Sequence, residues 1–386
     1  MKTRPRLAPP TPEEVEAALD RLSPFRLAEA WDNVGVLLAT SRKSLGRILL
    51  TIDLTERVLD EAIAKRADGI VAYHPPIFAP LKRLADRDRV ERTIRRAAAE
   101  NLWIASPHTA LDAAPNGLND WLVGLAGKGR VEALRPASIA RPTESFKIVT
   151  FVPKSSVDAV RAAMSQAGAG RIGDYSECAF SSDGTGTFLG GASTQPVVGS
   201  RGRLERVEES RLEMVCGAAS LAAAIESLRA SHPYEEPPIE VHALQPPPRV
   251  DAGAGRVMHL VKPTDLASLA KSFCRGLELS RIDVAEAKHG RAKQRVARIG
   301  VCAGSGGDLL DAAIEQGCDA FLTGELSHHR VLDAVSRGLS ILLVGHTESE
   351  RGYLPTLAKR LKQACPGLET VVSKADRPPL QTIVDR

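Results

Sequence analysis

The sequence predicts an α/β protein in which a discontinuous main domain, with mainly parallel sheets flanked by helices, is interrupted by an inserted α+β domain. Two observations predict this arrangement. Short apolar runs alternate with amphipathic segments near both ends of the chain, a pattern typical of βαβ units. The central stretch breaks that alternation and lies between proline-rich segments. We therefore expect residues 1–143 and 247–386 to form the main domain, with residues 144–246 inserted between its halves.

The first segment alternates strand and helix. TPEEVEAALDRLSP begins with a threonine N-cap, then a proline at the first helical position and glutamates in the first turn, which is a strong helix start. The elements expected after it are the strand RILLTIDL (47–54), the helix TERVLDEAIAKRA, the strand GIVAYH, the helix DRVERTIRRAAAEN, the strand LWIAS and a helix beginning in NGLNDWLVGLAG. Short apolar strands between helices imply a mainly parallel sheet covered on both faces.

The last segment repeats this plan. Its expected elements are the helix PTDLASLAKSFCRGL, the strand RVARIGVCAG, the helix GGDLLDAAIEQG, the strand CDAFLTGE, the helix LSHHRVLDAVSRG, the strand SILLVGH, the helix ESERGYLPTLAKRLKQAC and the strand LETVVSKAD.

The central segment, from about Phe146 to Leu244, has a different order: strand, helix, two strands rich in glycine, serine and threonine, helix and strand. That β-α-β-β-α-β order suggests a ferredoxin-like module. RPASIARPTES before it and QPPPRVDAGAG after it are expected to be linkers.

The composition is ordinary for a soluble globular protein, with 43% apolar and 25% charged residues and a net charge of +4. The basic residues are scattered along helices such as residues 89–100, so solvated faces are favoured and nucleic-acid binding is not supported. Six cysteines show no CxxC spacing, and Cys302 and Cys318 are expected to be buried. No apolar run approaches the ~20 residues of a membrane span. With no signal-peptide pattern either, a cytoplasmic protein is expected.

Polar, ligand-capable side chains stand where several predicted strands end. They are His74, His108, Glu325 and His346, with Asp112 and Glu350 each four residues after a histidine. Sites in open α/β sheets form at the carboxyl ends of strands. Imidazole and carboxylate are also the usual ligands of a hydrolytic divalent metal. We therefore predict a metal site built from both ends of the chain.

Other motifs carry weaker signals. His328 and His329 follow Glu325, and only one of them is expected to face the sheet end, beside the ligands or in proton transfer. GSGGD (304–308) is interpreted as a tight strand–helix connection rather than a phosphate loop. The absence of GxSxG leaves a serine hydrolase unsupported.

Two further motifs allow two interpretations each. Trp31, Asp32 and Asn33 either line a pocket or cap the edge of the core, and the second is slightly favoured. HPYEEPP (232–238) is either a solvated loop or a ligand contact.

These motifs also match a family. AWDNVG, YHPPIF, HTALDAAPNGLND, GSGGDLL, DAFLTGELSHH and GHTESERG occur in the order seen in the dinuclear-metal-centre family of GTP cyclohydrolase 1 type 2 homologues, or Ngg-interacting-factor-three-like proteins. The resemblance covers nearly all of the two outer segments. The central module resembles the CutA-like insertion of some longer bacterial members.

The resemblance implies two divalent cations per chain, as Zn, Mn or Fe, held by a His-His pair, an Asp, a His and a Glu. His74 matches the second member of the pair, Asp112 the aspartate, His346 the later histidine and Glu350 the bridging glutamate. His108 matches a family histidine that is either a ligand or lies beside the site.

Tyr73 departs from the family pattern, because it stands where many members have the first histidine. A phenol with an ordinary pKa near ~10 is a poor replacement for imidazole at neutral pH, so one metal position is expected to be weaker. The resemblance also implies a homohexamer.

Two functions follow as expectations. The first is a metal-dependent hydrolase acting on a nucleotide-like or phosphate-bearing small molecule. Glu325 or His329 would then be the proton shuttle, and Tyr73 a donor to the substrate. The second is a metal-binding scaffold or regulatory protein without turnover. Metal content together with turnover on phosphoesters distinguishes them.

Overall fold

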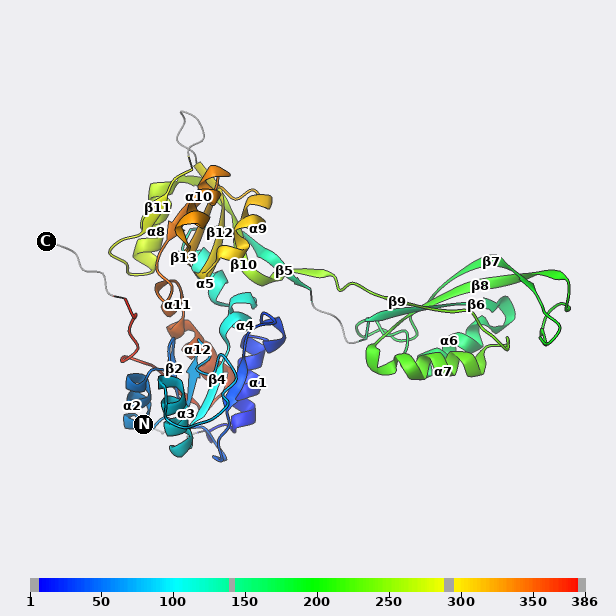
Figure 1. The fold of residues 1–386 in the computed structure, drawn as a ribbon, viewed down its shortest axis with the longest axis horizontal. Coiled ribbons are helices and arrows are strands. Elements are labelled where there is room, and N and C mark those ends of the chain that lie inside the picture. The colour runs from blue at the N-terminus through cyan, green and yellow to red at the C-terminus, as the bar shows by residue number, and fades with distance from the viewer. Residues whose placement is uncertain (1–6, 139–142, 288–294, 381–386) are drawn as a thin grey trace, which may run out of the picture. The chain divides into compact units, whose positions relative to one another are not determined.

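The computed structural model describes residues 7–138, 143–287 and 295–380, which form two compact units (Figure 1). One unit combines residues 1–137 with 249–386, and the other contains residues 138–248. In the described part of the chain no helix is long and apolar enough to cross a membrane.

The first sheet of the main unit contains strands from both ends of the chain, in the order β1-β4-β3-β2-β15. The strands are β1 (Gly35–Leu38), β2 (Arg47–Thr51), β3 (Gly69–Ala72), β4 (Trp103–Ser106) and β15 (Glu369–Val372). All pairings are parallel except that of β1 with β4. Because β15 pairs with β2, the C-terminal segment completes a sheet begun near the N-terminus.

Four helices of the first half follow the sequence pattern, whereas α4 (His108–Ala113) and a 3-10 turn at Phe25–Leu27 were not predicted. The four are α1 (Pro12–Leu22), α2 (Glu56–Ala64), α3 (Arg89–Ala99) and α5 (Leu118–Gly124). The capping box expected at the start of α1 is present, since Thr11 and Glu14 bond each other's backbone N–H groups. On α3, Arg92, Arg95 and Arg96 pair with acidic neighbours, which agrees with a solvated face.

The second sheet has the order β11-β14-β13-β12-β10-β5. Its strands are β5 (Gly129–Ser138), β10 (Pro248–Asp265), β11 (Asp283–Ala285), β12 (Arg295–Ser305), β13 (Ala320–Glu325) and β14 (Ser340–Leu343). Its helices are α8 (Leu266–Gly276), α9 (Leu310–Glu315), α10 (His328–Ser336) and α11 (Glu348–Arg351), with a 3-10 turn at Gly307–Leu309. The parallel core β12-β13-β14 has antiparallel neighbours, β10 and β11. This sheet is therefore mixed rather than mainly parallel.

Two sequence-based expectations for the C-terminal half need correction. The helix expected over ESERGYLPTLAKRLKQAC is divided into α11 and α12 (Leu354–Ala364). A side chain at Gly352 would meet the Trp121 ring at 2.4 Å, so the two helices are divided at the residue against which the indole packs. The linker expected in QPPPRVDAGAG is largely strand β10, because its backbone joins the second sheet. The preceding linker overlaps β5, and its residues 139–142 lie outside the described chain.

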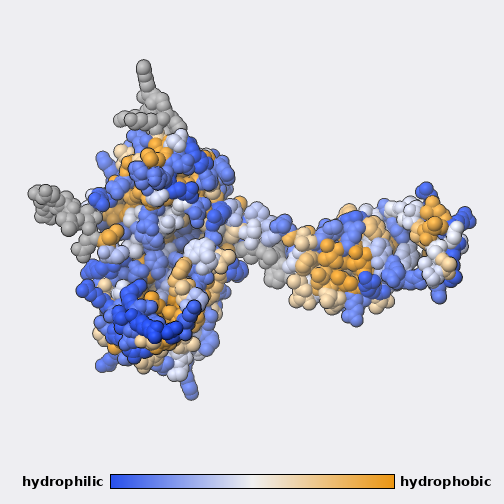
Figure 2. Space-filling view, in the orientation of Figure 1, coloured by the Kyte–Doolittle hydropathy of each residue, from blue (hydrophilic) through white to orange (hydrophobic). Residues whose placement is uncertain are grey.

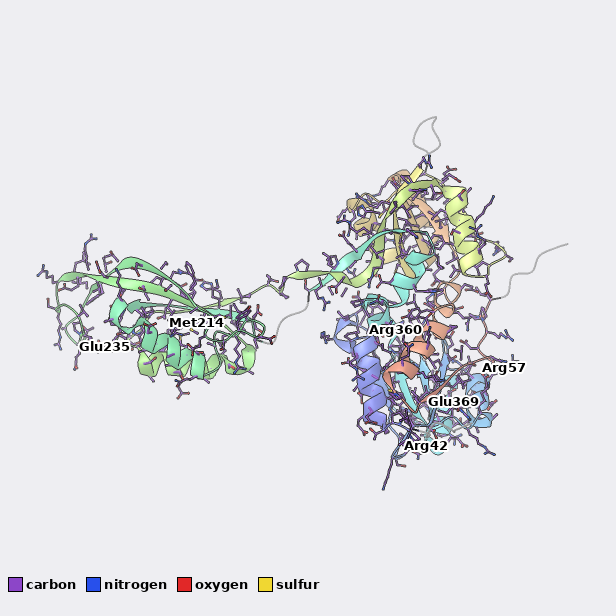
Figure 3. The ribbon with its side chains drawn as sticks, turned by 180° about the vertical axis from the view of Figure 1, so that it is seen from behind. Arg42, Arg57, Met214, Glu235, Arg360 and Glu369 are labelled. Atoms are coloured by element: carbon purple, nitrogen blue, oxygen red, sulfur yellow. The ribbon has the colours of Figure 1, made fainter. Side chains whose placement is uncertain are left out.

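The inserted unit has one antiparallel sheet of order β7-β8-β6-β9. Its elements are β6 (Phe146–Pro153), a 3-10 turn (Lys154–Ser156), α6 (Val157–Gln166), β7 (Phe180–Leu189), β8 (Leu204–Cys216), a 3-10 turn (Ala218–Ser220), α7 (Leu221–Ser231) and β9 (Ile239–Ala243). This is the β-α-β-β-α-β order expected from the sequence. Met214 of β8 lies in the core between the sheet and the two helices (Figure 3).

Candidate metal site

The candidate site forms where the carboxyl ends of strands from the two sheets of the main unit meet. His74 lies just after β3 and His108 opens α4 after β4. His346 follows β14, and Glu350 lies in α11. These groups are far apart in sequence and converge in the folded chain.

Glu350 is the centre of the cluster. Its side chain is only 2% exposed, and its two carboxylate oxygens face different imidazoles. Oε2 lies 3.5 Å from His74 Nε2, and Oε1 lies 3.4 Å from His346 Nε2. The ligand atoms of these three residues all lie within 4.8 Å of one another, so the group could hold a metal ion. Oε2 is buried and has no hydrogen-bond partner in the described chain, which is costly unless a cation satisfies it.

The other nitrogen of each imidazole in the cluster meets a carboxylate. His74 Nδ1 lies 3.0 Å from Asp53, and His346 Nδ1 lies 3.0 Å from Glu325. His108 Nδ1 lies 2.8 Å from Asp32. A carboxylate on Nδ1 orients the ring and leaves Nε2 free for a metal. In both His74 and His346, Nε2 is the nitrogen that faces Glu350.

Asp32 and Asp53 were not identified as functional from the sequence. Asp53 could have been found by the rule used for the histidines, because it follows the end of β2. Asp32 lies in an irregular turn with no periodic signal, and it also accepts hydrogen bonds from Thr109. AWDNVG lies beside the cluster, since Asp32 bonds a site histidine while Trp31 is 59% exposed, and the choice between a pocket wall and a cap of the core edge stays a prediction.

Tyr73, which is buried, and Asp112, which is part-buried, form a hydrogen-bonded pair beside the cluster. Tyr73 is 2% exposed and its hydroxyl donates to Asp112 Oδ1 at 2.7 Å. The Asp112 carboxyl interacts electrostatically with His108, Glu350 and His74. The His108 ring lies 5.4 Å from those of both Tyr73 and His74. All five predicted ligands therefore belong to one neighbourhood.

Concentrated charge perturbs the ionisation of the cluster. Burial lowers the pKa of His74, but Asp53 and Glu350 outweigh that effect and raise it to about 10. Burial raises the pKa of Asp112 to about 7, although the nearby imidazoles and the Tyr73 hydroxyl oppose it. Burial and the carboxylates of Asp112 and Glu350 raise the pKa of Tyr73 well above its ordinary value. The pocket therefore favours positive charge among its carboxylates, as a cation-binding site does.

Glycine at the end of β12 makes room for the cluster. Gly304 has a φ of +62°, and a Cβ there would lie 2.7 Å from Glu350 Oε1 and 3.2 Å from His346 Nε2. Its N–H donates to Ser349 Oγ at 2.8 Å, and Ser349 Oγ donates to the His346 carbonyl at 2.6 Å. The GSGGD segment is a tight strand–helix connection, as expected, and its first glycine also makes space for the site.

The remaining predicted residues differ in position. Glu325 is half-exposed and reaches the cluster through His346. His328 and His329 both lie on the surface at the start of α10, with their rings 5.7 Å apart. Both side chains are exposed, and the expectation that one of the two faces the sheet end stays a prediction.

Two cavities open beside His74. One of about 760 Å³ is lined by His74, His346, Glu325 and Arg281 among others. The second, of about 380 Å³, is lined by His74, Phe78 and Arg89 among others. Phe78 and Trp31 are 56% and 59% exposed, and their rings lie 6.0 Å apart. The cluster thus has space for a small molecule beside His74.

A family model for Duf34/NIF3 (NGG1p interacting factor 3) matches residues 10–379. The chain belongs to this family. Among its relatives, a GTP cyclohydrolase 1 type 2 homolog of Halalkalibacterium halodurans is 34% identical over 368 residues, covering 94% of this chain and 96% of the relative. NIF3-like protein 1 of Homo sapiens is 33% identical over 377 residues, covering 96% and 93%. The resemblance expected from the sequence motifs is therefore confirmed.

Solved structures of similar proteins have the same fold. A Bacillus cereus protein related to NIF3 is 30% identical, with a TM-score of 0.63 and coverage of 97% of this chain and 99% of that one. A Staphylococcus aureus protein is 24% identical, with a TM-score of 0.75 and coverage of 98% and 100%. The second likeness concerns the Duf34/NIF3 fold alone.

Proposed function

We propose that this Duf34/NIF3 protein is a hydrolase that uses two divalent cations, as Zn²⁺, Mn²⁺ or Fe²⁺, to cleave a nucleotide-like or phosphate-bearing substrate. The observation that carries the proposal is the position of Glu350, whose two oxygens each face a different imidazole. A carboxylate in that position is suited to bridge two cations.

The residues present fit such cations. The buried Glu350 Oε2 accepts no hydrogen bond in the described part of the chain, and imidazole with carboxylate is a suitable donor set. His74, His346 and Glu350 would hold the ions, with Asp112 and His108 as further ligands. Bound cations would polarise a substrate oxygen and make a water more acidic.

The surrounding residues would position these ligands and handle protons. Asp53, Asp32 and Glu325 hold the imidazoles through Nδ1, and Tyr73 holds Asp112. Glu325 also lines the larger cavity and is half-exposed, so it can pass a proton between His346 Nδ1 and solvent. His329 is less suited to this task because it lies on the surface of α10.

Two features favour a substrate with an anionic group and a flat ring. Arg281 lines the larger cavity and offers a cation for phosphate. Trp31 and Phe78 present exposed rings, and Trp31 lies 6.1 Å from the His108 ring. A base stacked on an aromatic side chain contributes about 1–3 kcal/mol. Together these groups would hold the two ends of a nucleotide beside His74.

The test combines metal content with turnover. We expect bound Zn²⁺, Mn²⁺ or Fe²⁺ by elemental analysis, and metal-dependent hydrolysis in a screen of phosphomonoesters, phosphodiesters and nucleotides. The Glu350→Gln variant should lose both the bound metal and the hydrolytic activity. The Glu348→Gln variant, changed in the same short helix, should keep its metal. Trp31→Ala should raise KM for a nucleotide but not for a phosphoester without a ring. Stoichiometric metal without turnover on any class would instead indicate a metal-binding scaffold or regulatory protein.

A further inference from the structure

The inserted unit contains a cavity of about 680 Å³ that the proposed hydrolase chemistry does not use. Its floor is the sheet face opposite α6 and α7. Along β8, Glu209 and Arg211 face the cavity, whereas Leu212 and Met214 face the helices. Its other wall comes from residues 194–198 and the HPYEEPP segment. The Gln195 N–H donates to Glu235 at 3.0 Å and ties these two segments together.

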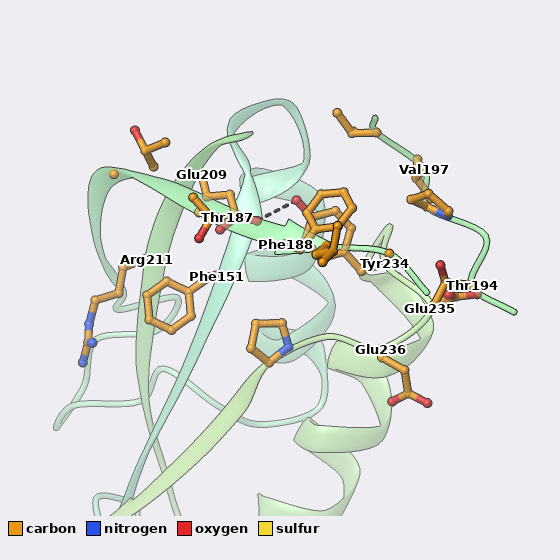
Figure 4. A pocket seen from close by; sticks show the side chains of 18 of the residues that line it. Phe151, Thr187, Phe188, Thr194, Val197, Glu209, Arg211, Tyr234, Glu235 and Glu236 are labelled. Atoms are coloured by element: carbon orange, nitrogen blue, oxygen red, sulfur yellow. Dashed lines mark hydrogen bonds between the residues drawn. The ribbon is translucent and has the colours of Figure 1, made fainter. Parts of the chain in front are cut away.

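Aromatic rings line this cavity. Figure 4 shows Phe151, Phe188 and Tyr234 among its side chains. The Tyr234 hydroxyl donates to Glu209 Oε1 at 2.6 Å, which fixes the phenol ring and a carboxylate together. Burial and Glu209 raise the pKa of the phenol, so it remains a donor. The volume of the cavity lies within the range of pockets that hold small molecules.

The charge of the lining is negative. Lys154 pairs with Asp183 at 3.2 Å, and Arg211 pairs with Glu213 at 2.8 Å while lying over the Phe151 ring. Glu209, Glu235 and Glu236 have no cationic partner among the described residues, and all three line the cavity. Aromatic faces and unpaired carboxylates both attract a cation, and an anion would meet repulsion.

The cavity also has an apolar part. Leu189 and Val197 belong to its wall and are 65% and 64% exposed. In Figure 2, hydrophobic side chains gather at the end of this unit that β7 and β8 form. A small metal or ammonium ion would leave this surface uncovered, so the occupant needs an apolar body as well as a charge.

We infer that the cavity of the inserted unit binds an organic ammonium compound, with its cationic nitrogen near Glu209 and Tyr234 and its apolar body against Phe151, Phe188 and Val197. Of the two interpretations of HPYEEPP, this inference favours the ligand contact over the solvated loop. The site belongs to the inserted unit alone and does not depend on the proposed metal chemistry.

Binding to the full-length protein tests the inference with phenyltrimethylammonium as the probe, measured by calorimetry or NMR titration. The neutral isostere tert-butylbenzene and the anion benzenesulfonate are the ligand controls. We expect saturable binding of the cation and binding about tenfold weaker or absent for both controls. Glu350→Gln should leave this binding unchanged, which separates the site from the metal cluster.

Variants of the lining residues test which carboxylate and which aromatic ring bind the cation. Glu209→Gln should weaken binding of the cation by about tenfold. Glu208→Gln is the matched control, because it removes the same charge from the neighbouring residue of β8, which does not line the cavity. Tyr234→Leu should weaken binding, whereas Tyr234→Phe keeps the ring and should retain most of it. Thermal melting of each variant shows that the fold is intact.

Three results would overturn the inference. They are no saturable binding of the cation, equal binding of tert-butylbenzene, and equal loss with Glu208→Gln and Glu209→Gln. The alternative occupant of the cavity is a second copy of the chain, and sedimentation measures whether the protein self-associates. If Phe188→Glu changes the oligomeric state while the wild type binds no cation, the cavity is a contact between copies.

Discussion

The Tyr73 hydroxyl donates a hydrogen bond to Asp112 Oδ1 at 2.7 Å, and both residues lie at the border of the histidine–glutamate cluster. In the family pattern matched by this sequence, many members have a histidine where Tyr73 stands. Here the phenol is buried and positions a predicted ligand instead of offering a ring nitrogen.

The first prediction concerns this pair. Tyr73→His should raise the amount of metal bound per chain, because imidazole is a neutral ligand at pH 7 and a buried phenol keeps its proton. Tyr73→Phe should lower occupancy, since Asp112 loses its donor. Elemental analysis after equilibration with Zn²⁺ measures both. Equal metal content in the three proteins would contradict this account of Tyr73.

The second prediction concerns the carboxylates that orient the imidazoles. Asp53→Asn should weaken metal binding by about 10–100-fold, because His74 Nδ1 loses a charged partner 3.0 Å away. Competition with a chromophoric chelator measures the affinity. Asp60→Asn is the control, since Asp60 is exposed and pairs with Arg96. An affinity that is the same for both variants would show that Asp53 does not orient the ring.

The third prediction concerns the glycine beneath Glu350. Gly304→Ala should lower metal affinity at least about tenfold, because the new Cβ would lie 2.7 Å from Glu350 Oε1. Its positive φ adds about 1–2 kcal/mol of strain. Gly173→Ala is matched for strain, with a φ of +56° and nothing within 4 Å of the added Cβ, and should keep full affinity. If both variants lose the metal equally, the contact between the added Cβ and Glu350 is not the cause of the loss.

The fourth prediction concerns stability in acid. Burial raises the pKa of Glu61, but hydrogen bonds from Ser373 and from the Ala375 and Lys374 N–H groups outweigh it and lower the pKa from 4.5 to about 2. The folded state therefore binds fewer protons than the unfolded state at this residue. Its contribution, on the order of 2 kcal/mol, is present above pH 4.5 and is lost as the pH falls toward 2.

Urea unfolding at several pH values checks this prediction. Glu61→Gln should reduce the free energy of unfolding at pH 7 and should flatten its decline between pH 4.5 and 2. Glu56→Gln, in the first turn of the same helix, removes an exposed pair with Arg92 and should cost at most about 1 kcal/mol. A decline in acid that is as steep in Glu61→Gln as in the wild type would exclude Glu61 as its source.

Local sequence was sufficient for most of the fold and for the candidate ligands. Apolar runs of strand length and the capping box at Thr11 act between near neighbours, so most elements of both halves could be predicted, although β1, α4, β5 and β11 were missed. The rule that polar residues gather at the carboxyl ends of parallel strands selected His74, His108 and His346 from nine histidines. Asp112 and Glu350 were added because each stands four residues after one of these histidines.

Only the tertiary structure decided which groups meet. The division of the last helix at Gly352 depends on the packing of Trp121, more than two hundred residues earlier in the chain. The pairings of Asp32 with His108 and Asp53 with His74 join turns that no periodic pattern connects. Side-chain contacts of this kind depend on where two sheets place their edges. Local propensity and residue spacing contain no information on the distance between the edges of the two sheets.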